Sequence, residues 1–97
     1  MTRYEANLLL YLETCAVDLG GRVASRRMNA VDFEIAERWN GEGFVEFGRI
    51  VYDHHNADGD HWVHLSERAW EASRLERRCR ADRMWAKRRY LQTRRVA

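Results

Sequence analysis

The chain has 97 residues, enough for one domain with a modest hydrophobic core that folds without disulfide or metal staples. Acidic residues closely flank the apolar run 8–12, which excludes a membrane span or a secretory signal there, so we expect a cytoplasmic protein. The net charge of +2 divides unevenly. Residues 1–73 carry 7 basic and 13 acidic side chains, a net of −6, whereas residues 74–97 carry 10 and 2, a net of +8. We expect an acidic domain, 1–73, and a basic arm, 74–97.

The first predicted element is a helix over residues 3–19. Apolar residues recur at steps of three and four, and this inner stripe comprises Tyr4, Leu8, Leu12, Cys15 and Leu19. Further apolar residues widen the stripe, which predicts a helix that is central to the core or shared with a partner. Gly20 and Gly21 are expected to end it.

Two further helices are predicted before the first strand. We expect a brief one around residues 23–28 and another over residues 30–41. Asn29 is a good N-cap for the second, and acidic residues follow in its first turn, where they favour the helix dipole. Its inner stripe comprises Val31, Ile35 or Ala36, and Trp39. Gly41 and Gly43 are expected to stop it.

A β-hairpin is predicted next. Residues 44–52 alternate and are rich in aromatic and β-branched residues, which favours a strand. Asp58-Gly59 is a hairpin turn signal, and residues 61–65 form a second short strand. In that strand Val63 and Leu65 point inward. Ser66 is a good N-cap for a last helix that runs from Glu67 to about Arg89 or beyond.

Two motifs in this order resemble the winged helix-turn-helix domains of the bacterial MarR-like type. The first is Trp39 followed by Gly43-Phe44-Val45, and the second is Val63-His64-Leu65-Ser66-Glu67. The resemblance covers about residues 5–72. It implies a mostly α fold with a small β-hairpin (α+β), in which the hairpin is the wing, and a long C-terminal helix follows.

The resemblance also implies binding of duplex DNA and transcriptional regulation. Carried over to this sequence, the backbone contacts fall on Arg22, Arg26, Arg27 and Arg38, and Asn29 and Asp32 lie at the bases. The charges oppose this, because the helix 30–41 carries Asp32, Glu34 and Glu37 and the wing carries three aspartates, all of which repel phosphate. The acidic surface favours an alternative: a phage-type, anti-CRISPR-like inhibitor that binds a nucleic-acid-binding host protein or nucleoprotein complex by mimicking DNA.

The wing contains His54, His55, His61 and His64. Adjacent strand residues point to opposite faces, so these side chains do not converge as zinc ligands, and we expect a polar loop and no metal. A pH-sensitive wing is the other interpretation. Trp62 and His64 point away from the core, which makes Trp62 either an interface anchor or a cover over Tyr52 or Ile50.

The basic arm has no glycine or proline and is predicted to be helical. Trp85 and Tyr90 are candidate stacking or interface residues, and the candidate phosphate or partner contacts are Arg77, Arg78, Arg80, Lys87, Arg88 and Arg89. Three interpretations stay open: a helix that packs or forms a homodimer with the first helix, a nucleic-acid-binding arm, and an arm that binds an acidic protein.

Catalysis is not expected. The sequence has no glycine-rich phosphate loop with the required lysine, and neither cysteine has a partner typical of a nucleophile. Cys15 and Cys79 are expected to be reduced and buried as small core residues. We expect no cofactor.

Overall fold

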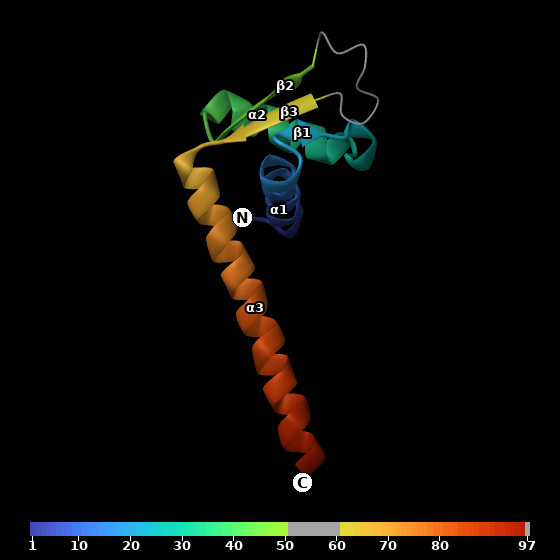
Figure 1. Ribbon diagram of the computed structural model, residues 1–97, viewed down its shortest axis with the longest axis vertical. Coiled ribbons are helices and arrows are strands. Elements are labelled where there is room, and N and C mark those ends of the chain that lie inside the picture. Colours follow the sequence, from blue (N-terminus) through green and yellow to red (C-terminus); the bar gives the residue numbers. More distant parts are fainter. Residues whose placement is uncertain (51–60, 97) are drawn as a thin grey trace.

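The computed structural model describes residues 1–50 and 61–96, with backbone only for 90–96. The elements run in the order α1 (Arg3–Asp18), β1 (Arg22–Val23), the 3₁₀ helix η1 (Ser25–Arg27), α2 (Ala30–Glu42), β2 (Val45–Arg49), β3 (His61–Leu65) and α3 (Glu67–Val96). The described residues therefore form a mostly helical α+β fold with a small antiparallel sheet. Figure 1 shows α1, α2 and the sheet gathered in one body, from which α3 projects.

The first helix, α1, is at the centre of the core, which is the first of the two alternatives expected for it. It begins with a capping box: the Glu5 amide donates to the Thr2 hydroxyl, and the Glu5 carboxylate accepts from the Thr2 amide. Leu9 and Leu12 are fully buried, and each such side chain contributes about 1.5–3 kcal/mol. The predicted stripe was wrong at its two ends. Tyr4 lies exposed in the first turn, and Leu19 is the exposed C-cap, so neither reaches the core.

The turn after α1 leads into a strand that the sequence analysis missed. Gly20 and Gly21 both have positive φ, and the Gly21 carbonyl accepts a 2.8 Å hydrogen bond from the amide of Val63. The next two residues form β1, and Val23 is fully buried. The brief helix predicted around residues 23–28 was therefore wrong at Val23, which belongs to β1, and is only a single 3₁₀ turn over Ser25–Arg27. A two-residue strand is too short to display the alternation that identifies strands.

The helix α2 confirms the predicted element and its N-cap. Ile35, Ala36 and Trp39 are buried, whereas Val31 is 46% exposed, so the predicted inner stripe was wrong at Val31. The helix ends at Gly43, whose left-handed φ of 74° suits the residue after a helix C-terminus. Gly41 lies within the helix and does not stop it.

The sheet has the strand order β1-β3-β2. Strands β2 and β3 pair antiparallel in the register Val45 with Leu65 and Phe47 with Val63, and these side chains face α1 and α2. With β1 the sheet has three strands, whereas the sequence predicted only a two-stranded hairpin. Strand β2 ends at Arg49, short of the predicted boundary at residue 52, and the predicted turn at 58–59 lies outside the described residues.

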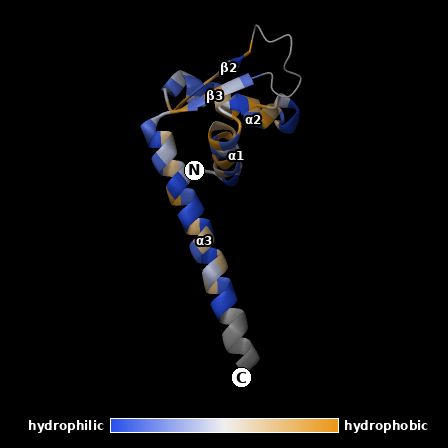
Figure 2. Cartoon of the chain, viewed as in Figure 1, coloured by the Kyte–Doolittle hydropathy of each residue, from blue (hydrophilic) through white to orange (hydrophobic). Residues whose placement is uncertain are grey.

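The last helix, α3, is a continuous element of 30 residues, about 45 Å long. Ser66 caps it as predicted, because its hydroxyl accepts from the amide of Ala69. Ala69 and Ser73 are fully buried at the start of the helix, whereas residues 81–89 are all exposed. Figure 2 shows α3 hydrophilic for most of its described length. The second half of α3 thus extends into solvent as a basic helix.

Candidate functional site

Three of the four arginines expected to contact DNA backbone lie at the surface in β1 and η1, before α2. Arg26 and Arg27 belong to η1 and are exposed, and neither forms an ion pair with another residue that the structure describes. Arg22 is exposed in β1, directly across from Trp62. Arg26 and Arg27 thus lie shortly before the N-terminus of α2, whereas Arg22 lies on the sheet.

The two residues expected at the bases are engaged with each other. The Asn29 side-chain oxygen accepts a 2.9 Å hydrogen bond from the Asp32 amide, and the Asp32 carboxylate accepts a 3.1 Å bond from the Asn29 amide. This reciprocal pair is a capping box, which satisfies two amides that the helix leaves unpaired. Either side chain would have to leave the cap to read a base, at a cost of about 0.5–2 kcal/mol.

Arg38 does not lie with the other arginines. Its guanidinium donates to the Glu5 carboxylate at 2.6 Å and lies 4.0 Å from Glu42. The pKa of Glu5 is lowered, first by the hydrogen bond from the Thr2 amide and, to a smaller extent, by the Arg38 charge. Arg38 thus ties α2 to the start of α1, a structural role that the sequence did not reveal.

The outward face of α2 is acidic. Val31, Glu34 and Glu37 are all exposed, at spacings of three residues that place them on one side of the helix. Phosphate would be repelled from this face, since each like-charge contact at ~4 Å costs on the order of 1 kcal/mol in water. The charge conflict expected from the sequence is therefore present on the folded surface of α2.

The histidines of the wing do not form a metal cluster within the described ranges. No group of three or more His, Cys, Asp or Glu side chains in residues 1–50 and 61–96 is arranged to hold a metal ion. The His61 ring packs between two aromatic rings, stacked on Phe47 at 5.2 Å and edge-on to Phe33 at 5.4 Å. His64 is exposed opposite Glu46. The predictions for His54 and His55 lie outside the described residues.

Trp62 lies flat across the hairpin on the outer face of the sheet. A Cβ atom built on Gly48 would lie 2.8 Å from the indole, so the ring rests directly on this glycine. Trp62 is 40% exposed. The strand register pairs Trp62 with Gly48, whereas the predicted cover was over Tyr52, which lies outside the described residues, or Ile50. The partly exposed ring and Arg22 form one aromatic and basic site on the sheet.

The candidate residues of the arm separate into two groups. Arg77 donates to the side chains of Glu13 and Thr14 on α1, and Arg80 donates to Glu76 and Asn7. These two arginines attach α3 to α1. The remaining candidates, Arg78, Lys87, Arg88 and Arg89, are exposed along the projecting part.

The aromatic residues of the arm can be placed only in part. Trp85 is 61% exposed, so its ring is accessible to a stacking partner or an interface. The side chain of Tyr90 is not among those that the structure describes. The arm therefore presents at least one exposed aromatic ring among basic side chains.

The two cysteines differ in environment. Cys15 is fully buried as predicted, and burial raises the pKa of its thiol. Cys79 is exposed, so its predicted burial was wrong. Burial also raises the pKa of Tyr11, whose hydroxyl donates to the carbonyl of Ala24 at 3.2 Å. This bond holds the β1–η1 connection against α1.

Comparison of the chain with protein-family models, curated proteins and solved structures finds no match. Among the residues that the structure describes, none of the helices is both long and apolar enough to cross a membrane.

Proposed function

We propose that the chain is a winged helix-turn-helix domain that binds duplex DNA mainly through η1 and the projecting part of α3. The order of elements supports this fold, with η1 and α2 as the helix-turn-helix and β2–β3 as the base of the wing. The two motifs support it as well. Gly43 ends α2, Phe44 packs edge-on against Trp39 at 5.1 Å, and Val63 and Leu65 are buried.

One observation carries the function: α3 has positive charge, from residue 74 onward, that the described carboxylates do not neutralise. Residues 74–89 include eight basic and two acidic side chains. Three of the arginines pair with Glu13 or Glu76, whereas no ion pair with any described residue forms at Arg74, Arg78, Lys87 or Arg88. Affinity for DNA comes largely from neutralising phosphate, so these cations and those of η1 are its expected source.

The proposed interface differs from a typical helix-turn-helix in the role of α2. Its acidic outward face and its occupied N-cap do not favour base readout. We therefore expect binding with little sequence preference, because phosphate contacts position a protein on DNA without reading its sequence.

Fluorescence anisotropy with a labelled 20-base-pair duplex at low salt tests this proposal. Arg26→Gln/Arg27→Gln and Arg78→Gln/Lys87→Gln/Arg88→Gln should each weaken binding at least tenfold. Arg38→Gln is the matched control, since this arginine already pairs with Glu5 and should leave binding within about twofold. Absence of binding by the wild-type chain at low salt would refute the proposal.

A second candidate function rests on the acidic face of α2. With Val31 exposed beside Glu34 and Glu37, this face suits a basic protein groove that otherwise holds nucleic acid, as in an anti-CRISPR-like inhibitor. Titration of a purified CRISPR effector complex, with target-DNA binding as the readout, tests it. Inhibition that is lost in Glu34→Lys/Glu37→Lys would support this function. The same double variant should bind duplex DNA more tightly if DNA is the true ligand.

We also propose that the chain forms a homodimer through α1 and α3. Exposed apolar side chains lie on both helices, namely Tyr4 and Val17 on α1 and Leu75 and Trp85 on α3. Light scattering after size-exclusion chromatography should give twice the mass of one chain. Leu75→Glu/Trp85→Glu should give a monomer, and a wild-type monomer at all concentrations would refute the dimer.

A further inference from the structure

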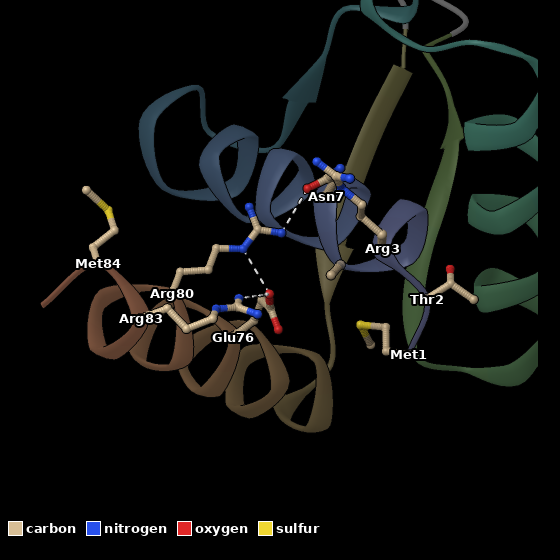
Figure 3. Close-up of a pocket in the computed structure, with 9 residues that line it drawn as sticks. Met1, Thr2, Arg3, Asn7, Glu76, Arg80, Arg83 and Met84 are labelled. Atoms are coloured by element: carbon tan, nitrogen blue, oxygen red, sulfur yellow. Dashed lines mark hydrogen bonds and ion pairs between the residues drawn. The ribbon is translucent and has the colours of Figure 1, made fainter. Parts of the chain in front are cut away.

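An open groove of about 690 Å³ lies where α3 passes the first turns of α1. Figure 3 shows that its residues come from both helices: Met1, Arg3 and Asn7 on one side, and Glu76, Arg80, Arg83 and Met84 on the other. The groove does not include the basic side chains proposed to contact DNA, because Arg26, Arg27, Arg78 and Lys87 do not line it.

The groove carries excess positive charge. The Glu76 carboxylate lies 2.8 Å from the Arg80 guanidinium and 3.5 Å from that of Arg83, so two cations share one anion. The hydrogen bond from Arg80 is the main cause of the lowered pKa of Glu76, which keeps this carboxylate ionised. Arg3 is exposed on the opposite wall and has no ion pair with a described residue. An incoming carboxylate would therefore meet Arg3 and the 70% exposed Arg83.

The groove is also apolar at both ends. Met84 lies on the same face of α3 as Ala69, Ser73 and Arg80, which is the face that packs on α1. At Met84 the helix extends beyond α1, and the Met84 side chain is 63% exposed. Met1, on the other wall, is 68% exposed. Methionine side chains adapt to the shape of a partner and recur on peptide-binding surfaces.

We propose that this groove binds an acidic peptide segment that also carries apolar side chains. The positive charge selects carboxylates, and the two methionines provide an apolar contact that a phosphate backbone would leave unused. Glutamate side chains of the segment pair with Arg3 and Arg83, while leucine or similar residues toward its two ends contact Met1 and Met84. This activity does not depend on the proposed DNA binding, since the two involve different residues.

Binding of a fluorescein-labelled 14-residue helical peptide of Glu, Leu and Ala, with its leucines on one face, tests the proposal. The wild-type chain should bind it at least tenfold more tightly than the same peptide with Gln in place of Glu. Arg3→Gln/Arg83→Gln should remove this preference, and Met84→Gln should weaken both peptides. Arg78→Gln/Lys87→Gln, which removes an equal charge from side chains that do not line the groove, should bind the acidic peptide as the wild type does.

Three results would overturn the proposal. The first is equal binding of the two peptides. The second is displacement of the acidic peptide by a 14-nucleotide oligothymidylate as effectively as by unlabelled peptide, which would make the groove a nucleic-acid site. The third is self-association that Arg3→Gln/Arg83→Gln abolishes, which would make a second copy the occupant. Since the substituted side chains are exposed, circular dichroism should show an unchanged fold in each variant.

Discussion

Three glycine-to-alanine substitutions test the unexpected connection between α1 and β1. Gly21 has φ +89°, and an added Cβ would lie 2.8 Å from the backbone oxygen of Val63. Alanine there would incur about 1–2 kcal/mol for the left-handed backbone. It would also weaken the hydrogen bond between Gly21 and Val63, which is worth about 1 kcal/mol. We expect Gly21→Ala to reduce the free energy of unfolding by about 3 kcal/mol, a large part of the ~5–15 kcal/mol typical of a domain.

The other two substitutions are controls for this value. Gly20 has φ +62° but open space around it. Gly20→Ala should therefore reduce the free energy of unfolding only by the cost of the left-handed backbone, about 1–2 kcal/mol. Gly41 is helical with no atom nearby, so Gly41→Ala should stabilise by about 0.5–1 kcal/mol. Urea denaturation followed by circular dichroism gives all three values. If Gly21→Ala and Gly20→Ala proved equally stable, the close approach of the turn to β3, and with it the reasoning, would be wrong.

Three further predictions concern single side chains. One thiol, that of Cys79, should react rapidly with a thiol reagent in the folded chain, and Cys15 should react only after unfolding; two fast thiols would contradict the buried site. Gly48→Val should displace the Trp62 ring and increase its exposure, which acrylamide quenching relative to Trp62→Phe would detect; unchanged quenching would contradict the cross-strand contact. The pKa of Glu5 is lowered in the folded state. The stability that its charge provides is therefore present above pH 4.5, the usual pKa of this group, and is lost as the pH falls through the lower pKa of the folded state. Glu5→Gln should therefore flatten the decline in stability at acidic pH, and parallel pH curves for the two proteins would refute this.

The elements that were predicted correctly are those with strong local signals. The apolar periodicity of α1, the N-caps Asn29 and Ser66, and the alternation in residues 61–65 are local signals, and all of them are present in the structure. Strand β1 escaped prediction because Val23 and the Gly21 carbonyl depend on a partner some forty residues away. The capping box of α1 had a readable signal, since Thr2 is followed by Glu three residues later.

The candidate site was less predictable than the fold because charge pairing depends on tertiary neighbours. Sequence spacing could not show that Arg38 contacts Glu5 or that Arg77 contacts Glu13, since these partners are 33 and 64 residues apart. Nor could it show that Gly48, with no side chain, lies beneath Trp62. The proposed DNA contacts are the basic residues that have no carboxylate partner among the described residues. Basic composition alone does not identify them.

The salt dependence of DNA affinity tests the central claim most directly. Four basic side chains of α3, namely Arg74, Arg78, Lys87 and Arg88, form no ion pair with a described residue, and each phosphate contact contributes about −0.9 to the slope of log K against log salt. We predict a wild-type slope of about −4 or steeper, and a slope shallower by about 3–4 when all four are replaced by Gln. A wild-type slope near zero, or an equal slope in the variant, would contradict the assignment of α3 as the principal DNA contact.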